Sequence, residues 1–151
     1  MAHSRKYSVN GSQTVDSSTD SVLGITGTTA VEPSIFFVGM GSETTPADNQ
    51  LIWRIGRTTA AGTATAVTPQ NLGPGTVAAT SSAGENHTAE PTYTAGAVLF
   101  RLGLNQRAAH SIVFDPEGCL TVPATSNNGL AAYPSHASAA PDVGMVMHFR
   151  E

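Results

Sequence analysis

The sequence predicts a single all-β domain, and three observations lead to that prediction. The 151 residues suffice for one domain with a substantial core, and hydrophobic residues make up 40% of them. Charged residues make up only 12%, and small residues such as Thr, Ser, Ala and Gly take their place, a composition that suits strands better than solvated helices. Short apolar runs also alternate with turn residues along the chain. We expect an antiparallel sandwich or barrel, jelly-roll-like, with an immunoglobulin-like topology as the alternative.

The first 20 residues are polar and predict an N-terminal arm that contains one short strand, Arg5–Val9. The sandwich or barrel domain is expected to follow, over residues 21–151. Terminal arms are often ordered only when a neighbouring subunit binds them. We therefore take Ser4–Gly11 as a candidate contact segment.

Two strands are expected early in the domain. Val22–Thr26 forms the first, and Ser34–Val38 (SIFFV) forms the second, a continuous apolar run that predicts a strand buried on both faces. Pro33 and Gly39 mark the two ends of this run. The next polar stretch, Gly39–Gln50, predicts a loop.

Two similar motifs, WRIG at Trp53–Gly56 and FRLG at Phe100–Gly103, lie in the two clearest amphipathic strands. In each strand the aromatic and aliphatic residues share one face, while Arg54 or Arg101 lies on the other. We expect the two strands to be neighbours in a sheet. Their arginines then face either water or another subunit.

The remaining elements are shorter. A long loop is predicted over Ser81–Thr94, and an antiparallel hairpin is predicted where the Pro116-Glu117-Gly118 turn joins two short apolar runs. The other expected strands are TATAV within Gly62–Pro74, Thr76–Thr80, Ser111–Asp115, Cys119–Val122, Leu130–Tyr133 and Val143–Arg150.

Charge and cysteine content exclude several functions. The net charge of −4 argues against nucleic-acid binding, which needs clustered basic residues. No apolar run reaches the length of a membrane span, and the N-terminal sequence lacks the apolar stretch of a secretory signal, so we expect synthesis in the cytoplasm. Cys119 is the one cysteine, so no intrachain disulfide forms, and it is interpreted as a buried, inert thiol.

No catalytic, cofactor-binding or metal-binding set is expected. The five histidines lie too far apart in the sequence for a metal motif, and we interpret them as isolated surface residues. No nucleophile–base pattern occurs, so an enzyme is the least favoured class. Tyr93 and Tyr133 lie near predicted loops, where they offer rings for stacking on a sugar. The histidines are His3, His87, His110, His136 and His148.

The order of these features resembles small β-rich proteins encoded in bacteriophage and prophage structural gene clusters. The resemblance rests on the Arg5–Val9 strand, on EPSIFFVGMGSE, on LIWRIGRTTAAGTATAVTPQNLGPG, on EPTYTAGAVLFRLGLNQRA, and on CLTVPATSNNGLAAY before the last strand. It spans most of the chain and is weakest in the first 20 residues.

This resemblance implies a virion protein similar to capsid decoration (cement) proteins. Such a protein is expected to bind the major capsid protein on the capsid surface as a homotrimer, without a cofactor, nucleic acid or membrane. The arm and the loops Gly39–Gln50 and Ser81–Thr92 are the expected lattice contacts. A tail, head-fibre or host-adhesion module and a carbohydrate-binding sandwich are the alternatives. The candidate interface residues are Arg5, Lys6, Tyr7, Arg54, Arg57, Arg101, Arg107 and Tyr93.

Overall fold

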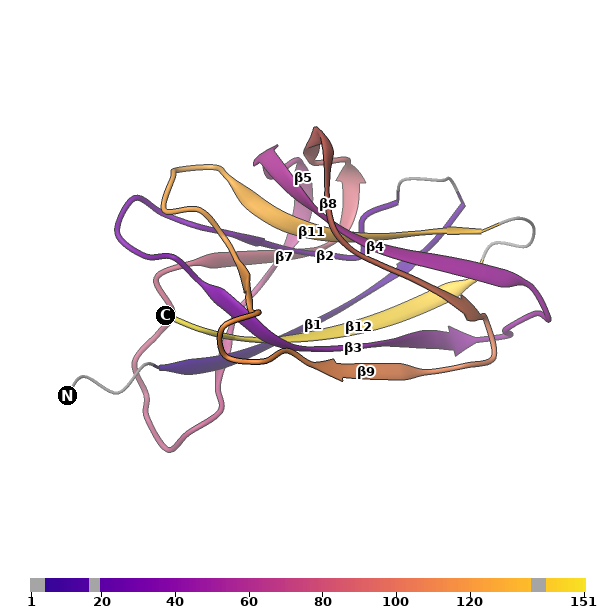
Figure 1. Cartoon of the computed structure of the whole chain (residues 1–151), viewed down its shortest axis with the longest axis horizontal. Coiled ribbons are helices and arrows are strands. Elements are labelled where there is room, and N and C mark those ends of the chain that lie inside the picture. The colour runs from indigo at the N-terminus through magenta and orange to yellow at the C-terminus, as the bar shows by residue number, and fades with distance from the viewer. Residues whose placement is uncertain (1–4, 17–19, 137–140) are drawn as a thin grey trace.

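The fold consists of two antiparallel β-sheets in a computed structural model that describes residues 5–16, 20–136 and 141–151. The predicted all-β class is therefore confirmed, and the two sheets form the upper and lower layers of a sandwich (Figure 1). No helix occurs in these described ranges, so none is present there that is long and apolar enough to span a membrane. His3 and residues 17–19 of the predicted arm lie outside them.

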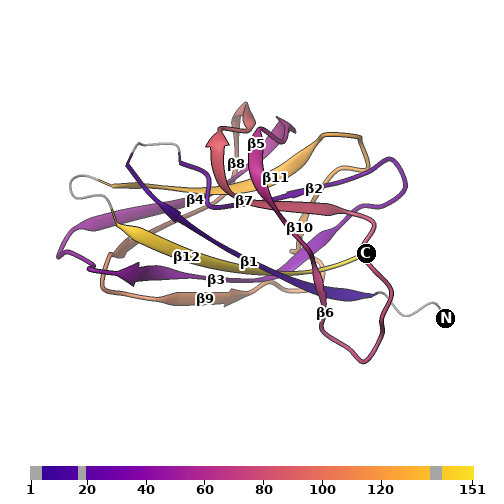
Figure 2. The ribbon, with the colours of Figure 1, turned by 180° about the vertical axis from the view of Figure 1, so that it is seen from behind.

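Sheet A forms the lower layer and is built around the last strand of the chain. The order across this sheet is β3, β12, β1 and β6, and both β9 and β10 pair with the outer side of β3. The short strand β6 is best seen from behind, in Figure 2. The strands are β1 (Lys6–Thr14), β3 (Ser34–Thr44), β6 (Gln70–Asn71), β9 (His110–Val113), β10 (Leu120–Thr121) and β12 (Asp142–Arg150).

Sheet B forms the upper layer. Its strand order is β5, β7, β2, β11, β4 and β8, so that β5 and β8 are the two edges. Successive strands often change sheet: β1 lies in sheet A, β2 in sheet B, β3 in sheet A and β4 in sheet B. The strands are β2 (Leu23–Thr26), β4 (Gln50–Ala60), β5 (Thr63–Val67), β7 (Ser82–Ala89), β8 (Thr92–Asn105) and β11 (Gly129–His136).

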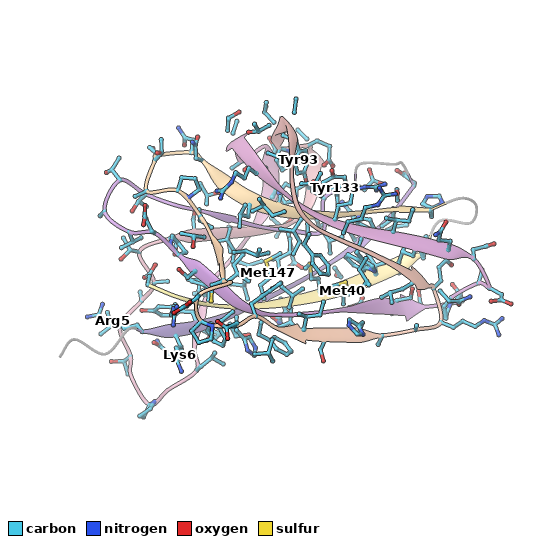
Figure 3. The ribbon with its side chains drawn as sticks, viewed as in Figure 1. Arg5, Lys6, Met40, Tyr93, Tyr133 and Met147 are labelled. Carbon is cyan, nitrogen blue, oxygen red and sulfur yellow. The ribbon has the colours of Figure 1, made fainter. Side chains whose placement is uncertain are left out.

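The core lies between the two sheets and follows from strict alternation in their central strands. In β12 every second residue is buried, from Val143 to Phe149, because side chains alternate between the two faces of a strand. Met147 of β12 and Met40 of β3 lie between the layers (Figure 3). Trp53 of β4 is 1% exposed and contributes the largest side chain to this core.

Most of the segment predicted as an arm is a strand of sheet A. From Lys6 to Thr14, β1 pairs with β12 over nine consecutive residues, which extends the strand predicted at Arg5–Val9. The backbones of Arg5 and Glu151 also exchange two hydrogen bonds of 3.1 Å. Tyr7, a candidate interface residue, is fully buried and stacks on Phe149 with a centroid distance of 5.4 Å.

Several predicted elements are wrong. Thr76–Thr80 is not a strand, and most of the loop predicted at Ser81–Thr94 is the strand β7. The loop predicted at Gly39–Gln50 is shorter, because β3 continues to Thr44. The predicted hairpin does not form: β9 and β10 do not pair with each other but lie one after the other along β3.

The strand SIFFV is buried on one face only. Ile35 and Val38 are fully buried, whereas Phe36 and Phe37 are half-buried on the outer face of sheet A. A β-bulge separates the pairs that these residues make with β12. The ring of Phe37 stacks on His148 with a centroid distance of 4.6 Å, so each ring covers the other on a face that no second sheet protects.

Candidate binding surfaces

The two arginines of the WRIG and FRLG motifs lie side by side. The strands that carry them, β4 and β8, are neighbours as predicted, and their register places Arg54 directly opposite Arg101. Both face away from the core, because their neighbours Trp53 and Leu102 pack inward. Two like charges in directly opposite positions repel each other, so this pair is electrostatically unfavourable unless an anion approaches.

The two arginines differ in their surroundings. Arg54 donates a 2.6 Å hydrogen bond to the Oγ of Ser135 and lies 5.8 Å from the ring centroid of Tyr133. Arg101 is exposed, and no described residue offers it a hydrogen bond or a carboxylate. Arg101 is thus the arginine of this pair that remains available to an external ligand.

Tyr93 and Tyr133, which the sequence places 40 residues apart, meet on the outer side of sheet B. Their ring centroids are 4.5 Å apart at a tilt of 57° (Figure 3). The register of β11 with β4 places Tyr133 opposite Arg54, so the tyrosine pair adjoins the arginine pair. Gly56 provides the space: a Cβ there would lie 3.1 Å from the Cδ1 of Tyr93.

A hydrogen-bond network holds the tyrosine pair in place. The hydroxyl of Ser21 lies 2.7 Å from the hydroxyl of Tyr93 and also donates to the carboxylate of Glu90. Burial raises the pKa of the Tyr93 hydroxyl, which keeps that group protonated and able to donate. One edge of the aromatic pair is therefore fixed, which favours a preformed stacking surface.

His87 is not the surface histidine that the sequence predicts. It is 7% exposed, and its Nδ1 lies 3.0 Å from the carbonyl oxygen of Ser21. Burial lowers the pKa of the imidazole, which favours the neutral form at neutral pH. Together with Gly24 and Thr58, His87 lines a small cavity of about 220 Å³ beneath the β5 side of sheet B.

Cys119 is likewise not buried as predicted. Its side chain is half-buried and forms no disulfide, and its Sγ lies 3.5 Å from the carbonyl oxygen of Asp115. The sequence placed Cys119 at the start of an apolar strand, but β10 begins only at Leu120, after the turn. The thiol is therefore reachable by solvent.

The other candidate interface residues are dispersed. Arg57 forms a hydrogen bond within the fold, because its Nη1 donates to the carbonyl oxygen of Thr121 over 3.0 Å. Arg107 is exposed in the turn between β8 and β9. Arg5 and Lys6 lie at the opposite end of the molecule, close to the N-terminus (Figure 3), where Lys6 Nζ lies 5.7 Å from the ring centroid of Phe36.

One side of the sandwich is closed by contacts between its layers. The carboxylate of Glu85 in β7 accepts a 2.9 Å hydrogen bond from the backbone N–H of Ser12 in β1. Nearby, the side-chain amide of Gln13 donates to the carbonyl oxygen of His87 over 3.1 Å. The hydroxyl of Tyr7 donates to the carbonyl oxygen of Val77, at 3.2 Å. These bonds satisfy backbone groups that an edge would otherwise leave unpaired.

The other side, formed by β8 and β9, is open. Val113 of β9 is 74% exposed and Leu99 of β8 is 38% exposed. Phe100 of β8 and Phe114 meet edge to face, with ring centroids 6.2 Å apart, and both remain only partly buried against the core. The sequence identified β8 as an amphipathic strand, but nothing in it indicated that the strand would lack a neighbour.

A groove of about 750 Å³ crosses the outer face of sheet A. Four glycines line it, Gly11, Gly39, Gly41 and Gly144, and the absence of their side chains lowers the surface there. Glu43 and Glu85 also line the groove, which gives it an acidic character. Sequence reasoning missed this groove, because its walls come from strands that are distant along the chain.

The described residues contain no group of three His, Cys, Asp or Glu side chains that could hold a metal ion. Comparisons with protein-family models, with curated proteins and with solved structures found no match.

Proposed function

We propose that the chain is a non-enzymatic structural protein of a bacteriophage virion, a capsid decoration protein that binds and stabilises the major capsid lattice. The observation that carries this proposal is the open side of the sandwich, where the long edge strand β8 carries exposed apolar and basic side chains. A protein that works by adhesion needs such a surface and needs no cofactor.

We also infer a jelly-roll topology. Its support is the strand order, in which β1, β12, β3 and β9 are neighbours in sheet A while β2, β11, β4 and β8 are neighbours in sheet B. In a jelly roll, eight strands form two Greek keys whose connections pass repeatedly between two sheets. On this interpretation β5, β6, β7 and β10 are additions to an eight-strand framework.

The lattice contact proposed for the N-terminal segment is best tested by substituting exposed side chains. Deleting residues 2–12 removes most of β1, including the buried Tyr7 and Val9, and would unfold sheet A instead of removing a surface arm. The exposed pair Arg5 and Lys6 can be changed to serine without that damage. Undiminished binding to undecorated capsids would exclude a role for these two side chains.

The main test is the copy number of the protein in purified particles of the phage or prophage that encodes it. A decoration protein is expected at a fixed ratio close to that of the major capsid subunits, and it should rebind to stripped capsids. Quantitative mass spectrometry measures that ratio. Absence from assembled particles contradicts the proposal, and a few copies per particle favours a tail, head-fibre or host-adhesion module.

A carbohydrate-binding function is the second candidate, and the contact between Tyr93 and Tyr133 favours it. Tilted aromatic rings beside an arginine are suited to stacking on a sugar and to binding its carboxylate. We expect any glycan identified on an array to bind at least tenfold more weakly when Tyr133 is replaced by alanine. The control is Tyr133→Phe, which keeps the ring. Equal binding by the alanine variant excludes this surface as a glycan site.

A further inference from the structure

The strand β8 differs from the other edge strands of the described structure. The short edge strands are β5, β6, β9 and β10, which contain five, two, four and two residues, whereas β8 contains 14. The part of β1 beyond its two-residue pairing with β6 is also an edge, but there the backbone N–H of Ser12 donates to Glu85 of the other sheet. Proteins protect sheet edges by making them short, by bending them with bulges, or by placing Lys or Pro on them. The edge strand β8 contains no Lys and no Pro.

The two halves of β8 differ in regularity. All register shifts between β8 and β4 lie on the side of Gly56 and Thr58, so they affect the first half of β8. From Phe100 to Asn105 the pairing with β4 is continuous and regular. The backbone groups on the free edge of this half are therefore regularly spaced for pairing with another strand. No backbone hydrogen bond to another described segment covers them.

The side chains of this half define which strand would fit. Phe100, Leu102 and Leu104 face the core side and are partly buried, so an added strand must bring apolar residues to that face. On the outer face, Arg101 is the one charged residue of β8. Because Arg54 lies directly opposite it, a carboxylate beside Arg101 would relieve the repulsion between the two guanidinium groups.

A second copy of the chain is a poor match for this edge. When two antiparallel β8 strands pair about Phe100 or Leu102, the two Arg101 side chains become diagonal neighbours on one face. Four arginines, two from each copy, would then gather on the outer surface without a carboxylate in either β8 strand. Charge complementarity therefore favours a different, acidic strand.

We propose that β8 is a docking edge for an extended segment of a partner protein, which pairs antiparallel with residues 100–104 and places an Asp or Glu side chain opposite Arg101. The partner segment alternates apolar residues, facing the sandwich interior, with polar residues that include this acid. Main-chain hydrogen bonds supply affinity and the alternating side chains supply specificity, as in other cases of strand addition. This inference deepens the proposed function, because it names the surface and the chemistry by which the lattice would be bound.

The test uses two synthetic peptides, VTVEVTV and VTVKVTV, acetylated and amidated at their ends. Paired antiparallel with the regular half of β8, each peptide places its central residue opposite Arg101 and the two adjacent valines opposite Phe100 and Leu102. We expect VTVEVTV to bind the wild type and to bind Arg101→Glu roughly tenfold more weakly. The lysine peptide should show the reverse preference. Fluorescence anisotropy of the labelled peptides measures both affinities, and circular dichroism verifies that the variant is folded.

The control variant is Arg107→Glu, which makes the same change in charge at an exposed position outside the edge strand. It should leave both affinities unchanged. A third peptide, VTVEVTV with alternate backbone nitrogens methylated so that it cannot donate, should not bind the wild type. Equal weakening by Arg107→Glu, undiminished binding of the methylated peptide, or binding of neither peptide overturns the inference.

The same variants separate this inference from the function on which it rests. If wild-type protein binds stripped capsids but Arg101→Glu does not reverse the preference between the two peptides, the edge-docking inference fails and the decoration function stands. If the peptides behave as expected but the protein is absent from particles, the docking edge stands and the decoration function fails. Sedimentation of the wild type as an oligomer that blocks peptide binding would assign the edge to a second copy and overturn the inference.

Discussion

Replacing Gly62 by alanine is expected to destabilise the protein by about 3 kcal/mol or more, because two separate penalties add. Gly62 lies between β4 and β5 with φ of +73°, a conformation that side chains disfavour. An added Cβ would also lie 2.7 Å from the carbonyl carbon of Glu90 and 2.8 Å from the nitrogen of Pro91. These are backbone atoms, which cannot rotate away as a flexible side chain does. Denaturant unfolding, followed by circular dichroism, measures the change.

Gly96 provides a matched control for the conformational part of this penalty. It has the same φ of +73°, but a Cβ built on it meets nothing within 4 Å. Gly96→Ala should therefore cost only the conformational penalty, roughly 1–2 kcal/mol. The difference between the two variants measures the steric clash beside Pro91. Equal losses in the two variants would contradict the close approach of the Gly62 turn to the segment before β8.

Replacing Trp53 by alanine is expected to lower the free energy of unfolding by about 3–5 kcal/mol. Trp53 is the largest fully buried side chain and lies in the middle of β4, between β11 and β8. Its removal leaves a cavity that strands on both sides hold open, because their own pairing prevents collapse. Calorimetry or denaturant unfolding measures the loss, and Val113→Ala, at a 74% exposed position, should change stability by no more than about 0.5 kcal/mol.

Trp53→Phe should cost clearly less than Trp53→Ala. The indole N–H of Trp53 is buried without a hydrogen-bond partner among the described residues, so its removal also removes an unfavourable group. The phenyl ring still fills most of the space. If the phenylalanine variant were as unstable as the alanine variant, the indole N–H would have a stabilising partner that the structure does not contain.

The parts of the fold that the sequence predicted are those with strong alternation. Trp53 differs strongly in polarity from Arg54, and Leu102 differs strongly from Arg101. Burial of the apolar residue therefore determines which face of each strand turns toward the core. Once both strands are assigned to one sheet, their motifs become candidates for direct pairing, and the register of Arg54 with Arg101 confirms this. The prediction succeeded because one-sided burial is a local property of each strand.

The errors concern strands whose existence depends on distant neighbours. Ser82–Ala89 contains small and polar residues of weak strand preference, and it is a strand because β2 and β5 pair with its two sides. Likewise, β9 and β10 are joined by a turn that is typical of a hairpin, yet both pair with β3. Local turn chemistry indicates that the chain changes direction, but it does not determine which strand is the partner.

The candidate sites were predictable only in part. The sequence identified Arg101 and Tyr93 as candidates, but it could not indicate that Tyr133 would contact Tyr93 or that β8 would be an edge. Both facts depend on the strand order, which is set by contacts between residues far apart in the chain. His87 was missed for the same reason, since its burial comes from packing against Ser21 and the β5 side of sheet B.

The register of β4 with β8 has a practical consequence for measuring occupancy of the edge. Trp53 is the one tryptophan of the chain and lies directly opposite Leu102, one strand away from the free edge. Its emission can therefore serve as an intrinsic optical reporter of changes in packing at the neighbouring strand β8. Titrations on the unlabelled protein can follow binding through this single tryptophan, without a dye that itself competes for the apolar surface.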